Sequence, residues 1–348
     1  MRSIIDIPRT ELNGHQTVNM VHRLRVIAQG LNLPLAGLSF LMDNLRDVFP
    51  NLPKDPRTIM RTPRSCHIRH ISGGTYVHVG LKSGLLGVIR QHFLNAKEVS
   101  IQLNVDGMQV YANSTIQLWT ILCRVVRPSV TTPFVVGIYC GNTKPTCPSE
   151  YLLDLTTELK SLLNEGIQET NTGVHVTSFI CDSPARAFIK QIKGHCAYFG
   201  CEFCVQRGVH TGIRMTFPCL QAPRRTDQSF RTQQQPGHHV GQSPFVDLPL
   251  SMIDVFPPDY MHAVCLGFVR RFLHLLRSVP RIHTAHVNRE RWECLHKTME
   301  SIRSWIPDDF QRKCRGVADL GRWKANECRQ FLFYIGPVVL LSLKMRQP

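Results

Sequence analysis

The spacing of apolar residues changes character along the chain. Between residues 14 and 48 apolar residues recur at helical spacing, and the segment Leu-Asn-Leu-Pro-Leu-Ala-Gly interrupts them, which predicts two short helices. From about residue 98 the pattern alternates and is rich in β-branched residues. It predicts three consecutive strands, at 99–105, 116–126 and 132–141.

A helix, a fourth strand and another helix are expected next. Residues 149–167 carry apolar side chains at i, i+3, i+4 and i+7, which predicts a helix, and residues 173–181 read as a strand. Ser183-Pro184 then opens a second helix. A strand after a crossover helix normally pairs in parallel with its sheet. A three-strand meander joined to a parallel strand predicts an α/β fold with an RNase H-like core.

The rest of the chain divides into a loop-rich part and a helical part. Residues 205–250 are rich in Gly, Pro, Gln and His, whereas 259–279, 289–305 and 323–345 have helical patterns. Because the chain stops inside the last pattern, a fragment is expected. The predicted organisation is a helical N-terminal segment (1–65), an RNase H-like core ending in a thiol knuckle (66–204), a loop-rich then helical insertion (205–315) and a C-terminal helix completing the core (316–348).

Charge and cysteine content narrow the class of protein. The 348 residues carry 41 Lys and Arg against 25 Asp and Glu, a net charge of +16. This excess favours a polyanionic partner, nucleic acid before anionic membrane, over a merely basic surface. No apolar run is long enough for a membrane span. The 13 cysteines are irregularly spaced, which indicates reduced thiols in the cytosol or nucleus.

Two aspartates are the candidate catalytic groups. Asp106 ends the first predicted strand and Asp182 ends the fourth, so both carboxylates should emerge at one edge of the sheet. Paired carboxylates suit Mg²⁺ or Mn²⁺ and phosphodiester chemistry. The plainer alternative is that each begins a turn or caps a helix.

A third carboxylate is expected on a helix after the insertion. Glu327 is the candidate because it opens the last apolar helix. Glu290, Glu293 and Glu300 lie in a charged amphipathic helix and are expected to face solvent.

The thiols and histidines predict a separate zinc site. Cys201 and Cys204 form a Cys-x-x-Cys pair, with His195 upstream and His262 in a later helix. Thiolates and imidazoles prefer Zn²⁺ to Mg²⁺. His238 and His239 are further candidates. Small buried cysteines and an ordinary core histidine remain the alternative.

Several segments together resemble transposases of the CACTA (En/Spm-like) group, within the eukaryotic cut-and-paste DDE superfamily. They are Leu-Asn-Val-Asp-Gly-Met-Gln-Val-Tyr at 103–111, Cys-Asp-Ser-Pro-Ala-Arg-Ala at 181–187, the Cys-x-x-Cys pair, and Asp-Tyr-Met-His at 259–262, together with segments from about 50 to 340. The resemblance implies an RNase H-like fold with a helical insertion. It also implies that Asp106, Asp182 and Glu327 are the three acids that bind Mg²⁺ and that the Cys-x-x-Cys and Asp-x-x-His motifs are present.

The resemblance predicts a function and leaves alternatives open. It implies a nuclear protein that cuts and joins DNA at transposon ends with two divalent ions, and a homo-oligomer is compatible with it. A domesticated, catalytically inactive nucleic-acid-binding protein is the main alternative, because no zinc-finger-like DNA-binding domain appears before residue 50. A zinc-stabilised interaction module is the third reading, and it leaves the positive charge unexplained.

Overall fold

The chain forms two compact units in the computed structural model, Met1–His67 and Ile68–Pro348. The structure describes residues 14–31, 33–62, 65–111, 113–212, 214–280 and 285–345. Residues 1–13 of the predicted N-terminal segment and 346–348 of the predicted C-terminal helix lie outside this range. The two units are described separately below.

The first unit is a small helical bundle. Helices α1 (Gly14–Gly30) and α2 (Leu35–Leu45) confirm the two predicted helices and the break between them. A short third helix, α3 (Pro56–Met60), was not predicted; the Asp55 side chain caps it by accepting a hydrogen bond from the Arg57 N–H. The buried side chains that hold the three helices together are Leu24, Ala28, Leu38, Met42, Leu52 and Ile59.

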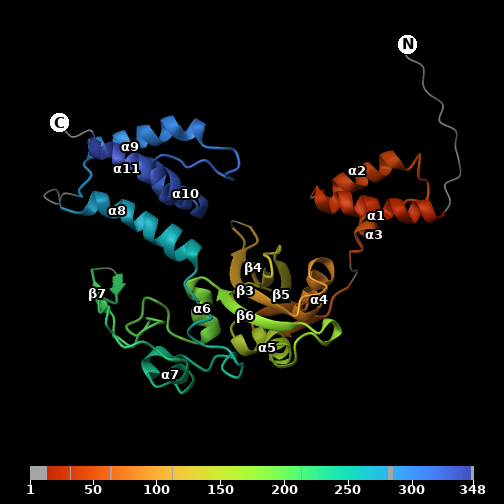
Figure 1. The fold of residues 1–348 in the computed structure, drawn as a ribbon, viewed down its shortest axis with the longest axis horizontal. Coiled ribbons are helices and arrows are strands. Elements are labelled where there is room, and N and C mark those ends of the chain that lie inside the picture. Colours follow the sequence, from red (N-terminus) through yellow and green to blue (C-terminus); the bar gives the residue numbers. More distant parts are fainter. Residues whose placement is uncertain are drawn as a thin grey trace, which may run out of the picture. The chain divides into compact units, whose positions relative to one another are not determined.

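A six-stranded mixed sheet dominates the second unit, in the order β1-β2-β5-β4-β3-β6 (Figure 1). The strands are β1 (Ile68–Ile71), β2 (Gly74–His78), β3 (Glu98–Gln109), β4 (Gln117–Arg127), β5 (Phe134–Gly141) and β6 (Gly173–Ile180). The predicted meander and fourth strand are confirmed, and β6 pairs in parallel with β3 as expected. The fold is therefore α/β at this level of description.

The hairpin β1–β2 and the helix α4 (Leu81–His92) were missed by the sequence reading. The hairpin turns at Gly73, whose φ of +96° suits glycine best. The pair Gly73-Gly74 between two short alternating runs was the available signal. Including this hairpin extends the predicted meander by two strands beyond β5.

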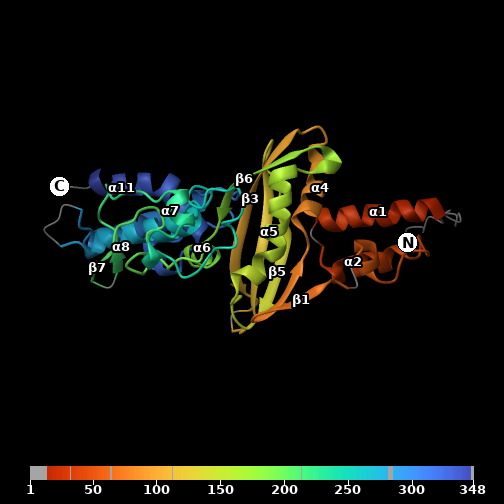
Figure 2. The same cartoon turned by 90° about the horizontal axis from the view of Figure 1, so that it is seen from below.

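Helices cover one face of the sheet. Helix α5 (Pro148–Glu165) runs along that face beside α4 (Figure 2). Along β3 every second residue is buried, namely Val99, Ile101, Leu103 and Val105. The intervening Gln102, Asn104 and Asp106 are half-buried and polar, so the β3 strand has one apolar and one polar face.

The segment after β6 begins with a short helix and continues as a long, mostly irregular stretch. Helix α6 (Ser183–Lys190) follows β6 directly. The irregular stretch contains the hairpin β7 (Val209–Thr211) and β8 (Arg214–Thr216) and the helix α7 (Asp227–Arg231). This agrees with the predicted loop-rich region.

The irregular stretch returns to the sheet near residue 255. The Phe179 N–H of β6 donates to the Val255 carbonyl at 2.7 Å, and the Phe256 ring stacks on the Phe179 ring with centroids 5.0 Å apart. The ring centroids of Phe245 and Phe179 are 4.9 Å apart in the same cluster. Residues from 245 to 256 therefore belong to the main hydrophobic core with the sheet.

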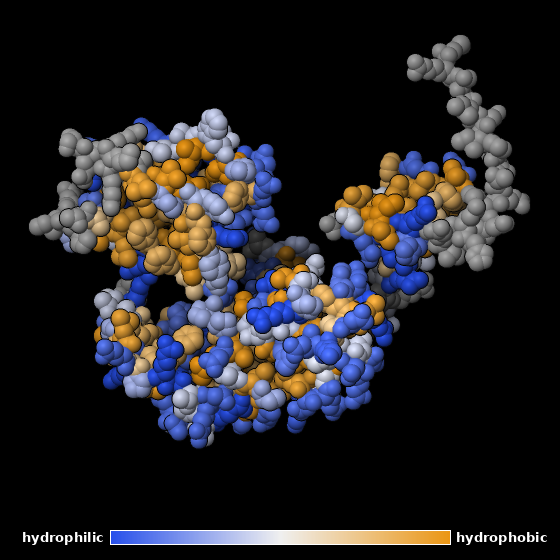
Figure 3. Space-filling model, in the orientation of Figure 1, coloured by the Kyte–Doolittle hydropathy of each residue, from blue (hydrophilic) through white to orange (hydrophobic). Residues whose placement is uncertain are grey.

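The remaining helices form a second hydrophobic cluster. They include η3 (Met261–Val269, with π-type hydrogen bonding), α8 (Arg270–Ser278), α9 (Arg289–Ile302), η5 (Val317–Arg322), α10 (Ala325–Gln330), η6 (Phe331–Ile335) and α11 (Gly336–Met345). Their shared core contains Trp292, Leu295 and Trp323. Hydrophobic surface also remains exposed over this part (Figure 3), for example at Phe268 and Phe272. No helix of the described residues is long and apolar enough to cross a membrane.

Candidate active site

Asp106 and Asp182 lie where the parallel pairing of β3 with β6 ends. Asp106 was expected at the end of its strand, but it lies inside β3 opposite Thr120 of β4, because β3 stays paired with β4 as far as Gln109. In the parallel pairing of β3 with β6, the last pair is Asn104 with Ile180. Asp106 lies two residues after Asn104, and Asp182 lies two residues after Ile180. The Asn104 side-chain amide donates to the Ile180 carbonyl at 2.6 Å, which ties the two strand ends together. The parallel pairing therefore brings these two predicted site residues close to each other.

The surroundings of Asp106 disfavour its negative charge. Partial burial raises the pKa of the Asp106 carboxyl, the Gly107 N–H at 2.8 Å lowers it, and the charge of Asp182 raises it further. The net shift is upward. A cation beside the two carboxylates would relieve the repulsion between them, and none of the ion pairs among the described residues includes either one.

Asp182 also has the structural role that the sequence offered as its alternative. Its Oδ1 accepts a hydrogen bond from the Ala185 N–H at 2.7 Å and caps α6. The next residue, Ser183, places its Oγ 3.1 Å from the His195 Nδ1. Capping uses one carboxylate oxygen of Asp182 and fixes the side chain at the helix start.

A histidine–aspartate pair, Asp259 and His262, lies near Asp106. The His262 Nδ1 is 2.5 Å from the Asp259 Oδ2, and the charges of both residues affect the pKa of Asp106. Asp259 also accepts hydrogen bonds from the N–H groups of Met261 and His262, at 3.1 and 3.3 Å. The Asp-x-x-His motif is thereby folded into one local unit at the start of η3.

The buried side chain of Arg186 links the backbone segments that lead to Asp182 and to Asp259. Arg186 of α6 donates from Nη1 to the Cys181 carbonyl at 3.1 Å and to the Pro257 carbonyl at 3.2 Å. Cys181 immediately precedes Asp182, and Pro257 precedes Asp259 by two residues. Arg186 therefore links the backbone on the Asp182 side to the backbone on the Asp259 side.

The same arginine reaches the thiol segment through Glu202, which lies between Cys201 and Cys204. The Arg186 Nε is 2.8 Å from both Glu202 carboxylate oxygens, and the Lys190 Nζ is 3.2 Å from one of them. All three side chains are 8% exposed or less. Hydrogen bonds and charge from the two cations outweigh burial and hold the pKa of the Glu202 carboxyl below its usual range.

The two predicted zinc thiols converge. The Sγ atoms of Cys201 and Cys204 are 3.1 Å apart, and the Gln206 side-chain amide donates to the Cys204 Sγ at 3.0 Å. The Arg225 Nε donates to the Cys201 carbonyl at 3.0 Å. Burial raises the pKa of the Cys204 thiol, but hydrogen bonds with Gln206 and Cys201, helped by the charge of Arg225, outweigh it and lower that pKa. The pair can hold one soft metal ion from one side.

The predicted histidine ligands are not assembled around these thiols. His195 contacts Ser183 and His262 contacts Asp259, so each imidazole has a different neighbour. Within the described ranges, no group of three or more His, Cys, Asp and Glu side chains is placed to hold a metal ion. His195 instead contacts Ser183 at the start of α6, and His262 contacts Asp259 just before η3.

His238, unlike His195 and His262, is hydrogen-bonded to the backbone just before the two thiols. Its Nδ1 donates to the Phe199 carbonyl at 2.6 Å, two residues before Cys201. The ring is fully buried, and burial lowers the pKa of His238 to about 4. Its Nε2 has no hydrogen-bond partner among the described atoms. A neutral imidazole whose other N–H donates to a carbonyl is the form that binds metals.

Glu327 is occupied by an ion pair within the second hydrophobic cluster. The Arg315 Nε and Nη2 each lie 2.8 Å from a different Glu327 carboxylate oxygen, and the Lys324 N–H donates to the same side chain at 2.8 Å. The Glu327 side chain is 2% exposed. Among the described residues no hydrogen bond or ion pair joins Glu327 to Asp106 or Asp182, and Arg315, which lies on a loop, takes both of its oxygens.

Two parts of the site were not recognised from the sequence. Arg186, Lys190 and Glu202 were not singled out from the sequence, and nothing local reveals that Glu202 is buried against the two cations. Asp259 and His262 were singled out by their motif, but their place beside Asp106 depends on the return of the chain to β6. The expected parallel pairing of β6 with β3 was the signal that did succeed.

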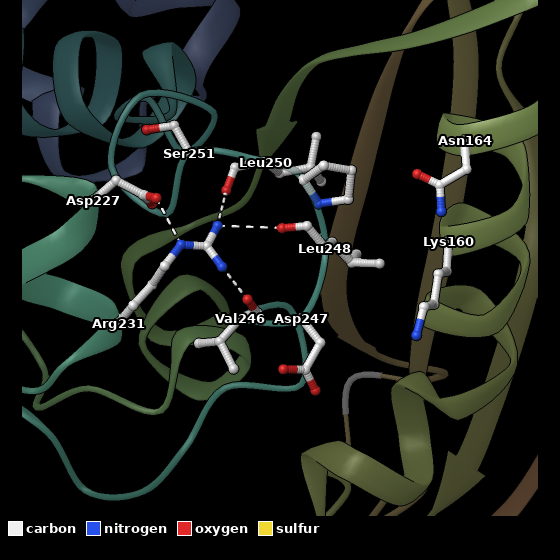
Figure 4. A pocket seen from close by; sticks show the side chains of 10 residues that line it. Lys160, Asn164, Asp227, Arg231, Val246, Asp247, Leu248, Leu250 and Ser251 are labelled. Carbon is white, nitrogen blue, oxygen red and sulfur yellow. Dashed lines mark hydrogen bonds and ion pairs between the residues drawn. The ribbon is translucent and has the colours of Figure 1, made fainter.

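A hollow elsewhere on the sheet unit has a structural explanation. Its volume is about 570 Å³, and it lies between the loop at 246–251 and helix α5, which contributes Lys160 and Asn164 (Figure 4). Arg231 fills its wall, bonded to Asp227 at 2.6 Å and to backbone carbonyls of the loop. The arginine is satisfied by the chain itself and anchors the loop.

No protein-family model matches this chain, and no curated protein matches it significantly. The function is therefore argued from the site.

Proposed function

We propose that this protein is a DDE-type transposase or a transposase-derived nuclease, which cleaves and joins DNA phosphodiester bonds at Asp106 and Asp182. The observation that carries the proposal is that these two carboxylates come together just beyond the last pair of the parallel strands β3 and β6. An RNase H-like core belongs to the same proposal. It is supported by the β5-β4-β3-β6 order, an antiparallel meander with a parallel strand at its edge.

Mg²⁺ or Mn²⁺ is the proposed cofactor at the two aspartates. Oxygen ligands suit these ions, and burial together with the charge of Asp182 raises the pKa of Asp106, so a bound cation would favour its ionised form. When bound, such ions supply Lewis-acid stabilisation of phosphate oxygens and activate water. The chain's own contribution is to hold Asp106 and Asp182 at tied strand ends and to fix Asp182 through its capping bond.

The proposal assigns Glu327 a structural role. Its two oxygens are both bonded to Arg315 within a hydrophobic cluster, so the carboxylate has no side left for a metal ion. The third metal-binding acid implied by the family resemblance is then supplied by another residue or is lost.

Zn²⁺ at Cys201 and Cys204 is the second proposed cofactor. The convergent thiols fit half of a tetrahedral site. Among the histidines, the buried and unpartnered Nε2 of His238 makes this residue a better candidate for a further ligand than His195 or His262. The role of the metal would be to stabilise the segment that carries Glu202.

DNA is the proposed partner and the nucleus the proposed location. The net charge of +16 supports a polyanionic partner, and a protein that neutralises many phosphates binds with steep salt dependence. Transposon ends as the specific DNA, and assembly into a homo-oligomer, belong to the same proposal through the family resemblance.

The decisive experiment is metal-dependent nicking of DNA that carries the ends of the flanking element. We expect nicking in Mg²⁺ or Mn²⁺, none in EDTA, and loss of nicking in Asp182→Asn and Asp106→Asn. Asp309→Asn is the matched control because it removes an exposed carboxylate from another part of the chain. Equal nicking by the wild type and Asp182→Asn would refute the proposal.

A catalytically silent nucleic-acid-binding protein is the second candidate. The ion pair that occupies Glu327 favours it, because an intact third acid is expected of an active enzyme. In this case the wild type and Asp182→Asn would bind DNA equally and neither would nick it, with or without metal.

A further inference from the structure

The pair Asp259–His262 is the strongest feature of the site that the proposed function leaves without a role. Asp259 accepts three hydrogen bonds, from the N–H groups of Met261 and His262 and from the His262 ring, when the ring nitrogen carries a proton. The Asp259 side chain is 13% exposed, whereas that of His262 is 41% exposed. The aspartate is thus the buried anchor, and the imidazole is the accessible part.

The backbone that leads to this pair is fixed against the strand that leads to Asp182. The Phe179 N–H of β6 donates to the Val255 carbonyl, and Arg186 bridges the Cys181 and Pro257 carbonyls. These hydrogen bonds join the two backbone segments, so the position of the pair follows from contacts within the second unit. The charges of Asp259 and His262 accordingly affect the pKa of Asp106.

The orientation of the ring leaves one nitrogen for an outside group. Because Nδ1 faces the Asp259 carboxylate at 2.5 Å, only Nε2 can meet a ligand. In the doubly protonated ring both nitrogens donate, Nδ1 to the carboxylate and Nε2 to an acceptor. A phosphodiester oxygen is such an acceptor, and it is also the group expected beside two carboxylates that bind metal ions.

We propose that His262 contacts the DNA phosphodiester at the carboxylate site and that Asp259 positions it there. This inference rests on the proposed function and identifies a residue of the chain that binds the substrate. Mg²⁺ prefers oxygen over imidazole, so a histidine at this place is better suited to the substrate than to the metal. A charge-assisted hydrogen bond to a phosphate oxygen is worth more than a neutral one.

The test uses the full chain and two readouts. The first is nicking of supercoiled plasmid DNA in Mn²⁺, and the second is the anisotropy of a fluorescein-labelled DNA duplex in Ca²⁺, which also binds oxygen ligands. We expect His262→Ala to lower the nicking rate about tenfold or more. His262→Gln should recover part of the rate, because its amide nitrogen can reach towards the place of Nε2.

Two further variants separate a local role from a general one. His274→Gln changes an exposed histidine on α8, the helix that continues η3, and should nick like the wild type. Asp259→Ala should resemble His262→Ala in rate, since it removes the anchor. Thermal melting of each variant shows whether it is folded, and His262→Gln keeps the test valid if His262→Ala is not.

The outcomes distinguish the two proposals. If Asp182→Asn abolishes nicking while His262→Ala nicks at the wild-type rate, the proposed function stands and this inference is overturned. If the wild type binds DNA in an Asp182-dependent way without nicking it, the same comparison is made on affinity. If neither nicking nor binding depends on Asp182, the proposed function fails and this inference fails with it.

Discussion

Replacing Glu202 by glutamine removes the only negative charge from a buried cluster of three ionic side chains. Glutamine has nearly the same shape, so the change tests charge more than packing. Arg186 and Lys190 would keep their positions but lose the carboxylate to which both are bonded, at 2.8 and 3.2 Å. Arg186 also donates hydrogen bonds to the Cys181 and Pro257 carbonyls, so the substitution should disturb the backbone of the whole candidate site.

The expected loss of stability is large. Removing one partner of a buried ion pair costs about 3–5 kcal/mol, because the other charge is left without compensation. The glutamine oxygen can still accept one hydrogen bond, so we expect about 3 kcal/mol. For a unit of this size that corresponds to a fall in Tm of about 5–10 °C.

Thermal and urea unfolding measure the effect against a matched control. Glu293→Gln makes the same substitution in the pair Arg289–Glu293, whose side chains are 88% and 55% exposed. That control should change stability by less than about 0.5 kcal/mol. Equal unfolding curves for the two variants would refute the claim that the Glu202 cluster holds this part of the fold.

The pH dependence gives an independent check of the same cluster. The folded-state pKa of Glu202 is lowered, so its stabilisation is complete above the unfolded pKa of a glutamate and is lost as pH falls through the folded value. The stability difference between wild type and Glu202→Gln should therefore shrink in acid. The pKa of Lys190 is also lowered, chiefly by burial, and loss of Glu202 should lower it further.

Three other changes test separate parts of the structure. Cys201→Ser should lose bound zinc, measured by elemental analysis, whereas Cys219→Ser, at an exposed thiol, should keep it. Glu327→Gln should lower Tm, because Arg315 loses its carboxylate partner, and should leave nicking per folded molecule unchanged; a loss of nicking at unchanged Tm would identify it as a metal ligand. Asp106→Asn should raise Tm at pH 7 and lose this advantage in acid, because a raised carboxyl pKa means that ionisation costs folding stability; an equal or lower Tm at pH 7 would count against the site's excess of negative charge.

Much of the sheet was predictable because its strands are long and strongly patterned. In β3 the alternation of Val99, Ile101, Leu103 and Val105 with polar residues identifies both the strand and its buried face. The helix between β5 and β6 makes parallel pairing of β6 the expected outcome, which places Asp106 beside Asp182. The short hairpin β1–β2 was missed because four or five residues carry little periodic signal.

The ligand sets could not be predicted in the same way. Thiols three residues apart must lie near each other, so the pairing of Cys201 and Cys204 follows from local geometry. The placement of His262 depends on where an irregular stretch of the chain rejoins the sheet, and no local pattern encodes that. Hydrogen bonds from Phe179 and Arg186 decide it, and they direct the imidazole to the carboxylate edge.

By itself, the sequence determined the strand order of the meander, the parallel crossover, the positions of the two aspartates and the basic character of the chain. These follow from periodicity, connection length and composition, which are properties of short segments. Only the tertiary structure decided that Glu202 is buried between two cations and that Arg315 takes both oxygens of Glu327. Partners far apart in the chain meet only through packing, so the free carboxylates and the neutralised ones can be told apart only once the chain is folded.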